Sequence, residues 1–418
     1  MNIVYVWDAD YPWDVRTEKV CAALTAAGHS VHIAARNRAW SPAVETLPEG
    51  TVHRMPPWRA LGRGGDAALS LPAFFNPRWI AHLRRVIRVA RAEVLVVRDL
   101  PLCPTALWVG RRARIPVVFD MAEHYPAMIR GTWDAGRAGP LDVLVRNPRA
   151  AEIVERWCLP RVDRVITVIP ESAARVMALG VSPTRVSVVN NTPPASRVHE
   201  TGPRPVRASG EPLRLVYMGL MEVGRGITDL LDAVGLLRDR GLEPRLTLIG
   251  GGRDLELLKA HAAELALAPP EVEFTGWMPS HAEALARVAD ADVGVLPHRR
   301  CEGWDATIPN KLFDFMAAGL AIASTDPVPT ARVVRETSCG LVFPSRDPEA
   351  MAEALLALRD PALRARMGAA GRAAILNAYN WEADAAVLVR EVESAARPGP
   401  LHLRPSAAPH PATAEPAL

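Results

Sequence analysis

The chain has 418 residues, of which 49% are hydrophobic and 23% are charged, a composition typical of globular proteins. A chain of this length is too long for one compact core and predicts two domains. No run of about 18 uncharged apolar residues occurs, which excludes a transmembrane helix. Residues 1–195 are basic, with 25 Lys and Arg against 17 Asp and Glu, whereas the remaining residues have 24 Lys and Arg against 29 Asp and Glu. Because no nucleic-acid-binding motif accompanies the basic half, no nucleic-acid partner is expected.

The first 195 residues alternate short apolar runs with helical patterns. Residues 2–7 lack the basic segment and cleavage site of a signal peptide and predict a first buried strand. A helical pattern from Thr17 to Ala27 stops at Gly28, a residue type that commonly ends helices. Because the apolar runs are continuous rather than alternating, they predict parallel strands covered on both faces. The further strands are predicted at 30–35, 93–97, 115–119 and 164–169.

One helical segment, residues 77–91, is both amphipathic and basic. Its apolar stripe consists of Trp79, Ile80, Leu83, Ile87 and Ala90. Its arginines, which lie mainly off that stripe, are Arg78, Arg84, Arg85, Arg88 and Arg91. Such a helix can lie in the headgroup plane of a membrane, so we predict that the first domain docks on an anionic membrane or an anionic lipid-linked acceptor. The alternative is a helix that covers the sheet of the first domain, with its arginines in water.

The alternation restarts in the second half of the chain. Residues 196–212 have no periodicity and predict a linker between a first domain at 1–195 and a second at 213–380. A helix is predicted at 381–396, and the Pro- and Ala-rich residues 397–418 are expected to be disordered. Two doubly wound domains side by side leave a cleft at the carboxyl ends of their strands, where ligands of such sheets bind. The strands of the second domain are predicted at 213–218, 245–249, 272–275, 292–296 and 320–323.

The five cysteines are scattered singly, without the spacing of a zinc site. This pattern indicates reduced thiols and a cytoplasmic protein, peripheral on the inner face of the cell membrane if the first domain docks there. The cysteines are Cys21, Cys103, Cys158, Cys301 and Cys339.

Two glycine-rich turns of the second half are candidates for anion binding. A strand ends at Gly219, and Arg225 follows just before a predicted helix, where backbone N–H groups and the helix dipole favour an anion. A guanidinium there can hold a diphosphate with two hydrogen bonds, and the alternative is a solvated arginine in a turn. Gly250 and Gly251 follow the next strand, where they allow either a close approach of the backbone to a ligand or a tight turn.

A third candidate is the helix start after Pro309, which suits the first turn of a helix. Lys311 and Asp314 are three residues apart and share a face of this helix. The lysine can meet phosphate oxygens, and the carboxylate can accept hydrogen bonds from paired ribose hydroxyls. The alternative is an ion pair on the helix surface, which contributes little.

In these motifs, taken together with their order and spacing, the sequence resembles glycosyltransferase family 4. The resemblance covers most of residues 1–395 and implies the α/β GT-B fold, in which two Rossmann-like doubly wound parallel-sheet domains face each other across a cleft. The motifs that carry it are Gly28-His29-Ser30-Val31, Val188-Val189-Asn190-Asn191, Gly219-Leu220-Met221, Arg225-Gly226, Gly250-Gly251-Gly252, Phe274-Thr275-Gly276 and Pro309-Asn310-Lys311-Leu312-Phe313-Asp314.

The resemblance implies that a nucleoside diphosphate-sugar binds the second domain and that its sugar passes to an acceptor hydroxyl with retention. Arg225 and Lys311 would stabilise the departing diphosphate, so no metal site and no cofactor is expected. The acceptor would be a lipid-linked or small-molecule glycan, used in the assembly of cell-surface polysaccharide, glycolipid or glycosylated natural products. The expected donor contacts are Gly219, Arg225, Gly250, Gly251, Lys311 and Asp314.

The family's two glutamates, eight positions apart, would fall on Ala306 and Asp314. Glu302 or Asp305, from the preceding loop, is expected to supply the missing sugar-contacting carboxylate. The loss at Ala306 leaves an alternative open, a catalytically weak homologue that binds nucleotide-sugar or a partner enzyme. A nucleotide-sugar epimerase on the same fold is a third interpretation.

The first domain carries the expected acceptor side. The strand ending at Phe119 leads into Asp120, Glu123 and His124, which resembles the family's Asp-x-His-Glu segment, with His124 two positions later than usual. Glu123 and His124 are therefore predicted as catalytic residues, and the alternative is a strand-end turn with a solvated histidine. The acceptor contacts are predicted to be Asp14, Arg16, Asp120 and Glu123.

Overall fold

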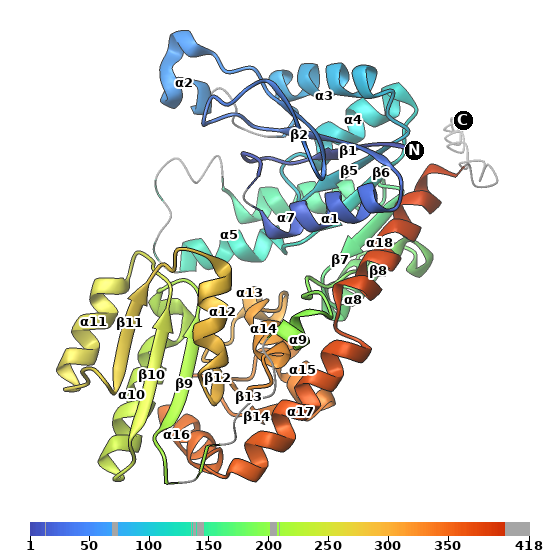
Figure 1. Ribbon diagram of the computed structural model, residues 1–418. Coiled ribbons are helices and arrows are strands. Elements are labelled where there is room, and N and C mark those ends of the chain that lie inside the picture. Colours follow the sequence, from blue (N-terminus) through green and yellow to red (C-terminus); the bar gives the residue numbers. More distant parts are fainter. Residues whose placement is uncertain are drawn as a thin grey trace, which may run out of the picture.

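The computed structural model describes residues 1–12, 14–68, 74–134, 136, 139, 146–200, 207–208 and 210–397. They form two α/β domains, each with its own sheet and its own hydrophobic core (Figure 1). The predicted fold class of two doubly wound domains is confirmed. Apart from Arg397, the tail predicted at 397–418 lies outside the described residues.

The first sheet has the strand order β3-β4-β2-β1-β5-β6-β7-β8. All of its neighbouring strands are parallel except the edge pair β3–β4, an antiparallel hairpin. The sequence predicted neither strand, because β3 is at most half-buried and β4 has no continuous apolar run. The strands of this sheet are β1 (Asn2–Val6), β2 (Ser30–Ala35), β3 (Val44–Leu47), β4 (Gly50–Arg54), β5 (Val94–Arg98), β6 (Val117–Met121), β7 (Arg164–Thr167) and β8 (Val186–Val188).

Helices on both faces cover this sheet (Figure 1). The N-cap of α1 is Asp14, whose side chain accepts a hydrogen bond from the Thr17 N–H at 2.7 Å. The helices of this domain are α1 (Val15–Ala26), α2 (Gly62–Ala68), which projects away from the sheet, α3 (Pro77–Ala90), α4 (Cys103–Ala113), α5 (Tyr125–Asp134), α7 (Pro148–Cys158) and α8 (Pro170–Ala178), with the short 3-10 turns η1 (Arg59–Leu61) and η2 (Pro183–Arg185).

The structure shows where the apolar stripe of α3 lies, and the docking of the first domain on an anionic membrane stays a prediction. The stripe packs into the first-domain core, where Trp79 and Leu83 are fully buried. Because these side chains already cover the sheet, they are not available to enter the headgroups of a membrane. The alternative interpretation of the segment is therefore the right one for its apolar face, while Arg84, Arg85 and Arg88 point to solvent.

The second sheet is entirely parallel, with the order β11-β10-β9-β12-β13-β14. Its strands are β9 (Leu213–Met218), β10 (Pro244–Ile249), β11 (Val272–Gly276), β12 (Val293–Leu296), β13 (Ala321–Ser324) and β14 (Gly340–Val342). The other elements of this half are α9 (Arg197–Glu200), η3 (Val223–Arg225), α10 (Ile227–Asp239), α11 (Leu255–Glu264), α12 (His281–Ala289), α13 (Glu302–Asp305), α14 (Lys311–Ala317), α15 (Val328–Thr337), α16 (Pro348–Ala357) and α17 (Pro361–Asn377).

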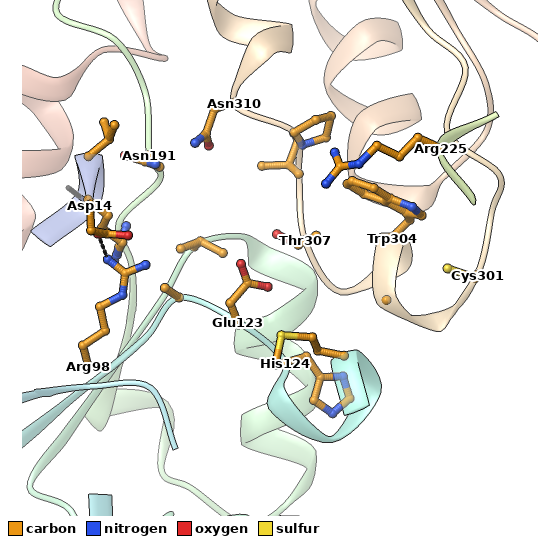
Figure 2. A pocket seen from close by; sticks show the side chains of 18 residues that line it. Asp14, Arg98, Glu123, His124, Asn191, Arg225, Cys301, Trp304, Thr307 and Asn310 are labelled. Atoms are coloured by element: carbon orange, nitrogen blue, oxygen red, sulfur yellow. Dashed lines mark hydrogen bonds and ion pairs between the residues drawn. The ribbon is translucent and has the colours of Figure 1, made fainter. Parts of the chain in front are cut away.

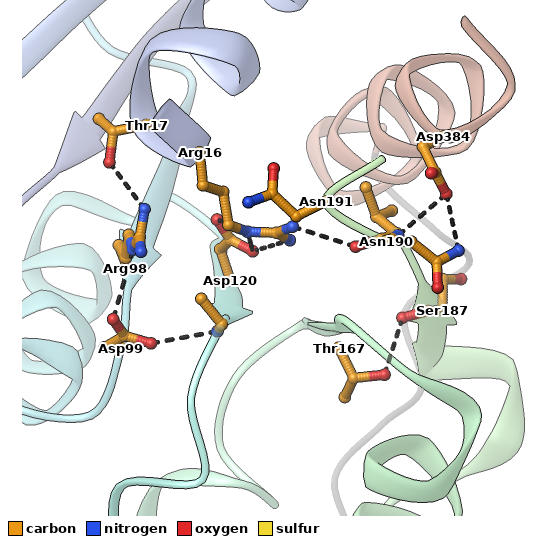
Figure 3. A network of polar contacts seen from close by, with 12 residues as sticks. Arg16, Thr17, Arg98, Asp99, Asp120, Thr167, Ser187, Asn190, Asn191 and Asp384 are labelled. Carbon is orange, nitrogen blue, oxygen red and sulfur yellow. Dashed lines mark hydrogen bonds and ion pairs between the residues drawn. The ribbon is translucent and has the colours of Figure 1, made fainter. Parts of the chain in front are cut away.

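The last helix, α18 (Trp381–Ala396), leaves the second domain and packs on the first (Figure 1). Its Leu388 and Val392 belong to the same core as Ile3 of β1. Asp384 accepts a hydrogen bond from the Asn190 N–H at 2.9 Å (Figure 3) and another from the Thr192 hydroxyl at 2.5 Å. The chain therefore crosses between the domains twice, which fixes the cleft between them.

Candidate active site

A cavity of about 650 Å³ lies between the two domains, at the carboxyl ends of the first-domain strands. Figure 2 shows side chains of both domains facing this space. Those labelled on the first-domain wall are Asp14, Arg98, Glu123, His124 and Asn191, and those on the second-domain wall are Arg225, Cys301, Trp304, Thr307 and Asn310.

Glu123 points into the cavity from the turn after β6 (Figure 2). The carboxyl group is open to the cavity yet enclosed by both domains, and this desolvation, with the nearby Asp99, raises its pKa to about 7. A carboxyl group with such a pKa can accept or release a proton near neutral pH. The structure thus brings Glu123 to the cavity with chemistry suited to the role predicted for it.

His124 lines the same wall but is only 8% exposed. Burial, together with the charge of Arg175, lowers its pKa to about 4, so the ring is neutral at pH 7. Its Nδ1 has no hydrogen-bond partner among the described residues. The alternative prediction of a solvated histidine does not hold, and the ring can offer a hydrogen bond without carrying charge.

Asp14 and Arg98 form an ion pair at the edge of the cavity (Figure 2). Arg98 also donates to the Thr17 hydroxyl at 3.0 Å and lies 3.3 Å from Asp99. Arg98 was not predicted from the sequence. Its position at the carboxyl end of a buried parallel strand is the signal that could have found it.

Arg16 and Asp120 were predicted as acceptor contacts, and the structure brings only Arg16 to the cavity, so the prediction for Asp120 is wrong. Although Arg16 borders the cavity, its Nη2 lies 2.5 Å from Asp120 Oδ1, and its Nη1 donates to the Val189 carbonyl at 3.0 Å (Figure 3). Asp120 is fully buried and also accepts from the Tyr5 hydroxyl at 2.9 Å. Burial alone would raise the pKa of Asp120, but the Arg16 guanidinium holds it below its usual value. The Arg16–Asp120 ion pair therefore lies in the wall of the cavity, where it holds the segments that carry the two residues together.

On the second domain, Arg225 lines the cavity and Lys311 lies behind it, outside the lining. Lys311 is buried at the start of α14, its Nζ 4.2 Å from the centre of the Tyr217 ring and without a hydrogen-bond partner among the described residues. Arg225, at the end of η3, lies over the Trp304 ring at 5.3 Å. Burial and the charge of Arg225 lower the pKa of Lys311 well below its usual value.

Two other buried nitrogen atoms near Lys311 also lack a hydrogen-bond partner among the described residues. Arg225 Nε makes no hydrogen bond within the described chain, although Glu222 lies 3.5 Å away, and His298 Nε2 also has no partner there. Buried donors are rarely left unpaired in native proteins, so such a group indicates a missing acceptor. Lys311 Nζ and Arg225 Nε, together with His298 Nε2 in the tautomer that carries its proton there, therefore favour an anion with several oxygen atoms.

The glycines predicted to approach a ligand are explained largely by packing. A β-carbon on Gly250 would lie 2.1 Å from the carbonyl oxygen of Gly219, and one on Gly251 would lie 2.5 Å from Trp277 Nε1. Gly219 has φ +143° and leaves room for Lys311. These residues shape the loops that follow β9 and β10, which holds Lys311 in position.

The carboxylates predicted for the donor site separate into two groups. Asp314 lies on α14 beside Arg197, with Oδ1 and Nη1 3.9 Å apart, and burial raises its pKa. Glu302 instead forms a two-point ion pair with Arg130 of the first domain. Asp305 accepts from the Val328 N–H at 2.8 Å and pairs with Arg300 at 3.1 Å. Neither Glu302 nor Asp305 lines the cavity, so the predicted sugar contact is not formed by either in this structure.

The described part of the chain contains no group of three or more His, Cys, Asp and Glu side chains that could hold a metal ion. None of its helices combines the length and the apolar character needed to span a bilayer.

Two family models match the chain, one on each domain. The model for a glycosyl transferase 4-like domain matches residues 14–192, and the model for glycosyl transferases group 1 matches residues 212–360.

Among proteins of assigned function, the chain is 27% identical over 319 residues to the putative colanic acid biosynthesis glycosyltransferase WcaL of Escherichia coli, covering 73% of this chain and 70% of that protein. It is 31% identical over 179 residues to the phosphatidyl-myo-inositol mannosyltransferase of Mycobacterium leprae. That second match spans 43% of this chain and 45% of the other protein, less than half of either.

Solved structures share the fold at low identity. HepE of Anabaena, solved in complex with UDP, aligns with a TM-score of 0.67 over 94% of this chain and all of that one, at 11% identity. WaaG, a glycosyltransferase involved in lipopolysaccharide biosynthesis, aligns with a TM-score of 0.62 over 93% of this chain and 99% of that one, at 15% identity. At these identities the likeness shows the GT-B fold.

Proposed function

The chain belongs to the family 4-like glycosyltransferases, which use nucleotide-sugar donors, and from this premise we propose that it transfers the sugar to an acceptor hydroxyl with retention and without a metal ion. The donor diphosphate binds between Arg225 and Lys311. The ribose of the nucleotide meets Asp314. The acceptor enters from the first domain, against Glu123 and His124.

The observation that carries this proposal is the group of orphaned nitrogen donors. Lys311 Nζ, Arg225 Nε and His298 Nε2 are buried and make no hydrogen bond within the described chain. A diphosphate supplies the oxygen acceptors that this group lacks, and its charge grows as the sugar departs. Cations in a site with little water stabilise that charge more than they would in bulk water.

In the reaction, the bond between the anomeric carbon and the diphosphate oxygen breaks while a bond to the acceptor oxygen forms on the same face. The acceptor hydroxyl proton passes to an oxygen of the departing diphosphate. Glu123 accepts a hydrogen bond from the acceptor hydroxyl and orients it. The two domain walls hold both substrates in one enclosed space, which supplies part of the acceleration by alignment and exclusion of water.

The acceptor class is proposed to be a lipid-linked or small-molecule glycan, in cell-surface polysaccharide, glycolipid or natural-product assembly. Similarity to WcaL, which is a putative colanic acid biosynthesis enzyme, supports this class. We place the reaction in the cytoplasm, at the inner face of the membrane.

The direct test has two stages. Thermal shifts with UDP-, GDP-, ADP- and dTDP-sugars identify the donor, and release of the free nucleoside diphosphate is then measured with glycan acceptors. Turnover that depends on the acceptor and continues in a chelator supports the proposal. Anomeric analysis of the product by NMR tests retention, and an inverted product refutes that part.

A catalytically weak binder is the second candidate. The specific observation in its favour is that Ala306 offers no carboxylate and that Glu302 is held by Arg130. This candidate predicts nucleotide-sugar affinity without diphosphate release, under conditions in which the thermal shift is saturated.

A further inference from the structure

The second-domain wall of the cavity between the domains carries no carboxylate among its described lining residues. The two carboxyl groups that do line the cavity belong to Asp14 and Glu123, and both lie on the first-domain wall (Figure 2). A sugar held against the second domain therefore meets no negatively charged acceptor there for its hydroxyl groups. The side chains of the second-domain wall include Arg225, Cys301, Trp304, Thr307 and Ile308.

Several oxygen acceptors of the loop that forms this wall are already engaged. Glu302 and Asp305 both pair with arginines and do not line the cavity. The Ala306 carbonyl accepts a hydrogen bond from the Ser172 hydroxyl at 2.9 Å. Among the described residues of the wall, the side-chain oxygens that remain for a sugar are those of Thr307 and Asn310.

The largest side chain of this wall is Trp304, and its ring is held from two sides. The Arg225 guanidinium lies over the ring, 5.3 Å from its centre, and the His298 ring packs against it with the ring centres 4.1 Å apart. His298 is buried, and its burial, together with the charges of Lys311 and Arg225, lowers its pKa well below the usual value, so it is neutral at pH 7. Trp304 therefore presents a fixed aromatic surface to the cavity (Figure 2).

The contact between Trp304 and Arg225 indicates which part of a donor meets the indole. In the proposed function Arg225 binds the diphosphate, and the anomeric carbon of the sugar is joined directly to a diphosphate oxygen. The sugar has to reach from there toward the acceptor beside Glu123, which lines the same cavity (Figure 2). The sugar ring therefore lies against Trp304.

An aromatic wall with few acceptors discriminates between a hydroxyl and a methyl group. A hydroxyl enclosed against the indole loses hydrogen bonds to water without replacing them, whereas a methyl group loses none and buries apolar surface. A 6-deoxyhexose carries a methyl group in place of the hydroxymethyl group, next to the C5–H. It thus has a continuous apolar edge that a parent hexose lacks.

We propose that the transferred sugar is a 6-deoxyhexose whose C5–methyl edge packs on Trp304, which makes Trp304 a specificity-determining residue. This inference rests on the proposed function, because it requires the diphosphate to bind at Arg225. Thr307 and Asn310 then serve the ring hydroxyls that the sugar keeps.

The test measures Kd by calorimetry with the full-length protein, so that it does not depend on the acceptor. For each base of the UDP-, GDP-, ADP- and dTDP-sugars, the gluco, galacto and manno donors are compared with their 6-deoxy counterparts, which differ only at C6. With the base that binds, one 6-deoxy donor should bind about 10–100-fold more tightly than its parent, since an apolar pocket rejects an added hydroxyl by roughly 10² at most.

Two variants of Trp304 test its role. Trp304→Ala should bring the ratio of the two Kd values close to 1, whereas Trp304→Phe should keep the preference. The ratio is the readout because any displacement of Arg225 affects both donors of a pair alike and cancels. Trp277→Ala is the matched control, because Trp277 is 69% exposed and lies outside the cavity, so the ratio should not change. Melting temperatures check that all three variants are folded.

The possible results separate this inference from the proposed function. If no free nucleoside diphosphate binds, the diphosphate site is wrong and this inference falls with it. If the free diphosphates bind but the parent hexose binds as tightly as its 6-deoxy form in every pair, only the sugar assignment is overturned. A preference that survives in Trp304→Ala, or that Trp277→Ala removes equally, overturns the role of Trp304.

Discussion

Lys311 passes so close to Gly219 that a β-carbon on the glycine would lie 2.5 Å from Lys311 Nζ. The two residues come from different segments, the loop after β9 and the start of α14. A larger residue than glycine at position 219 would therefore displace the Lys311 side chain. Lys311 Nζ reaches the Tyr217 ring only because no β-carbon occupies the space beside Gly219.

Gly219→Ala should displace Lys311 and weaken nucleotide binding without a direct contact to the ligand. We expect at least a tenfold rise in Kd for the nucleoside diphosphate, measured by calorimetry. Gly235→Ala is the control, because a β-carbon on that helical glycine meets no atom within 4 Å. Since φ at Gly219 is +143°, the melting temperature of the variant should also fall. Unchanged affinity would show that the lysine does not contact the diphosphate.

Arg225→Ala and Lys311→Ala should each lower turnover by roughly 10²–10³-fold, as loss of a charge-stabilising donor commonly does. The fold should stay intact, because neither cation completes a buried ion pair. Arg253→Ala provides a matched control, since Arg253 also pairs with Glu222 but does not line the cavity. Steady-state diphosphate release measures the effect, and near-normal rates in both variants would remove the assignment of the diphosphate site.

Glu123 should control the pH dependence of kcat/KM for the acceptor. Its pKa of about 7 means that the carboxyl group is protonated below that pH and ionised above it. Because the ionised form accepts the hydrogen bond of the acceptor, activity should rise through pH 7 and then level off. Glu123→Gln should remove this rise and lower kcat/KM while donor affinity is kept. The same rise in Glu123→Gln would assign the titration to another group.

His124→Ala should affect acceptor use and spare donor binding. The neutral ring faces the cavity from the first domain, and its Nδ1 has no partner within the described chain. We expect a higher KM for the acceptor and an unchanged Kd for the nucleotide-sugar. If acceptor kinetics are unaffected, the acceptor binds elsewhere.

The Arg130–Glu302 pair should act as a contact between the domains rather than as a sugar-binding group. In a double-mutant cycle with Arg130→Ala and Glu302→Ala, the two changes should therefore be strongly non-additive in KM for both substrates. If Glu302→Ala alone abolished turnover while Arg130→Ala kept near-normal turnover, Glu302 would instead reach the sugar when substrate is bound.

The order of elements could be read from local patterns. The apolar runs at 213–218 and 245–249 correspond to β9 and β10 because a continuous buried strand leaves a signature within a few residues. Gly28 ends α1 as expected, with φ +84°. Four strands escaped prediction. The edge strand β3 is at most half-buried, and β8 and β14 have only three residues each, so they leave little periodicity. Strand β4 is buried, but its sequence mixes polar residues with Val52 and has no continuous apolar run.

By itself, then, the sequence determined two doubly wound domains, and Arg225 and Lys311 at helix starts, because strands, turns and helix ends depend on neighbouring residues. Only the tertiary structure decided which charges face a ligand. Arg16 lies 104 residues before Asp120 and Arg130 lies 172 before Glu302, and nothing local shows that these groups meet. The same holds for α3, whose amphipathic pattern is equally consistent with a membrane or a sheet beneath it. Burial and ion pairing are properties of the assembled fold, so a periodic pattern cannot specify which surface covers it.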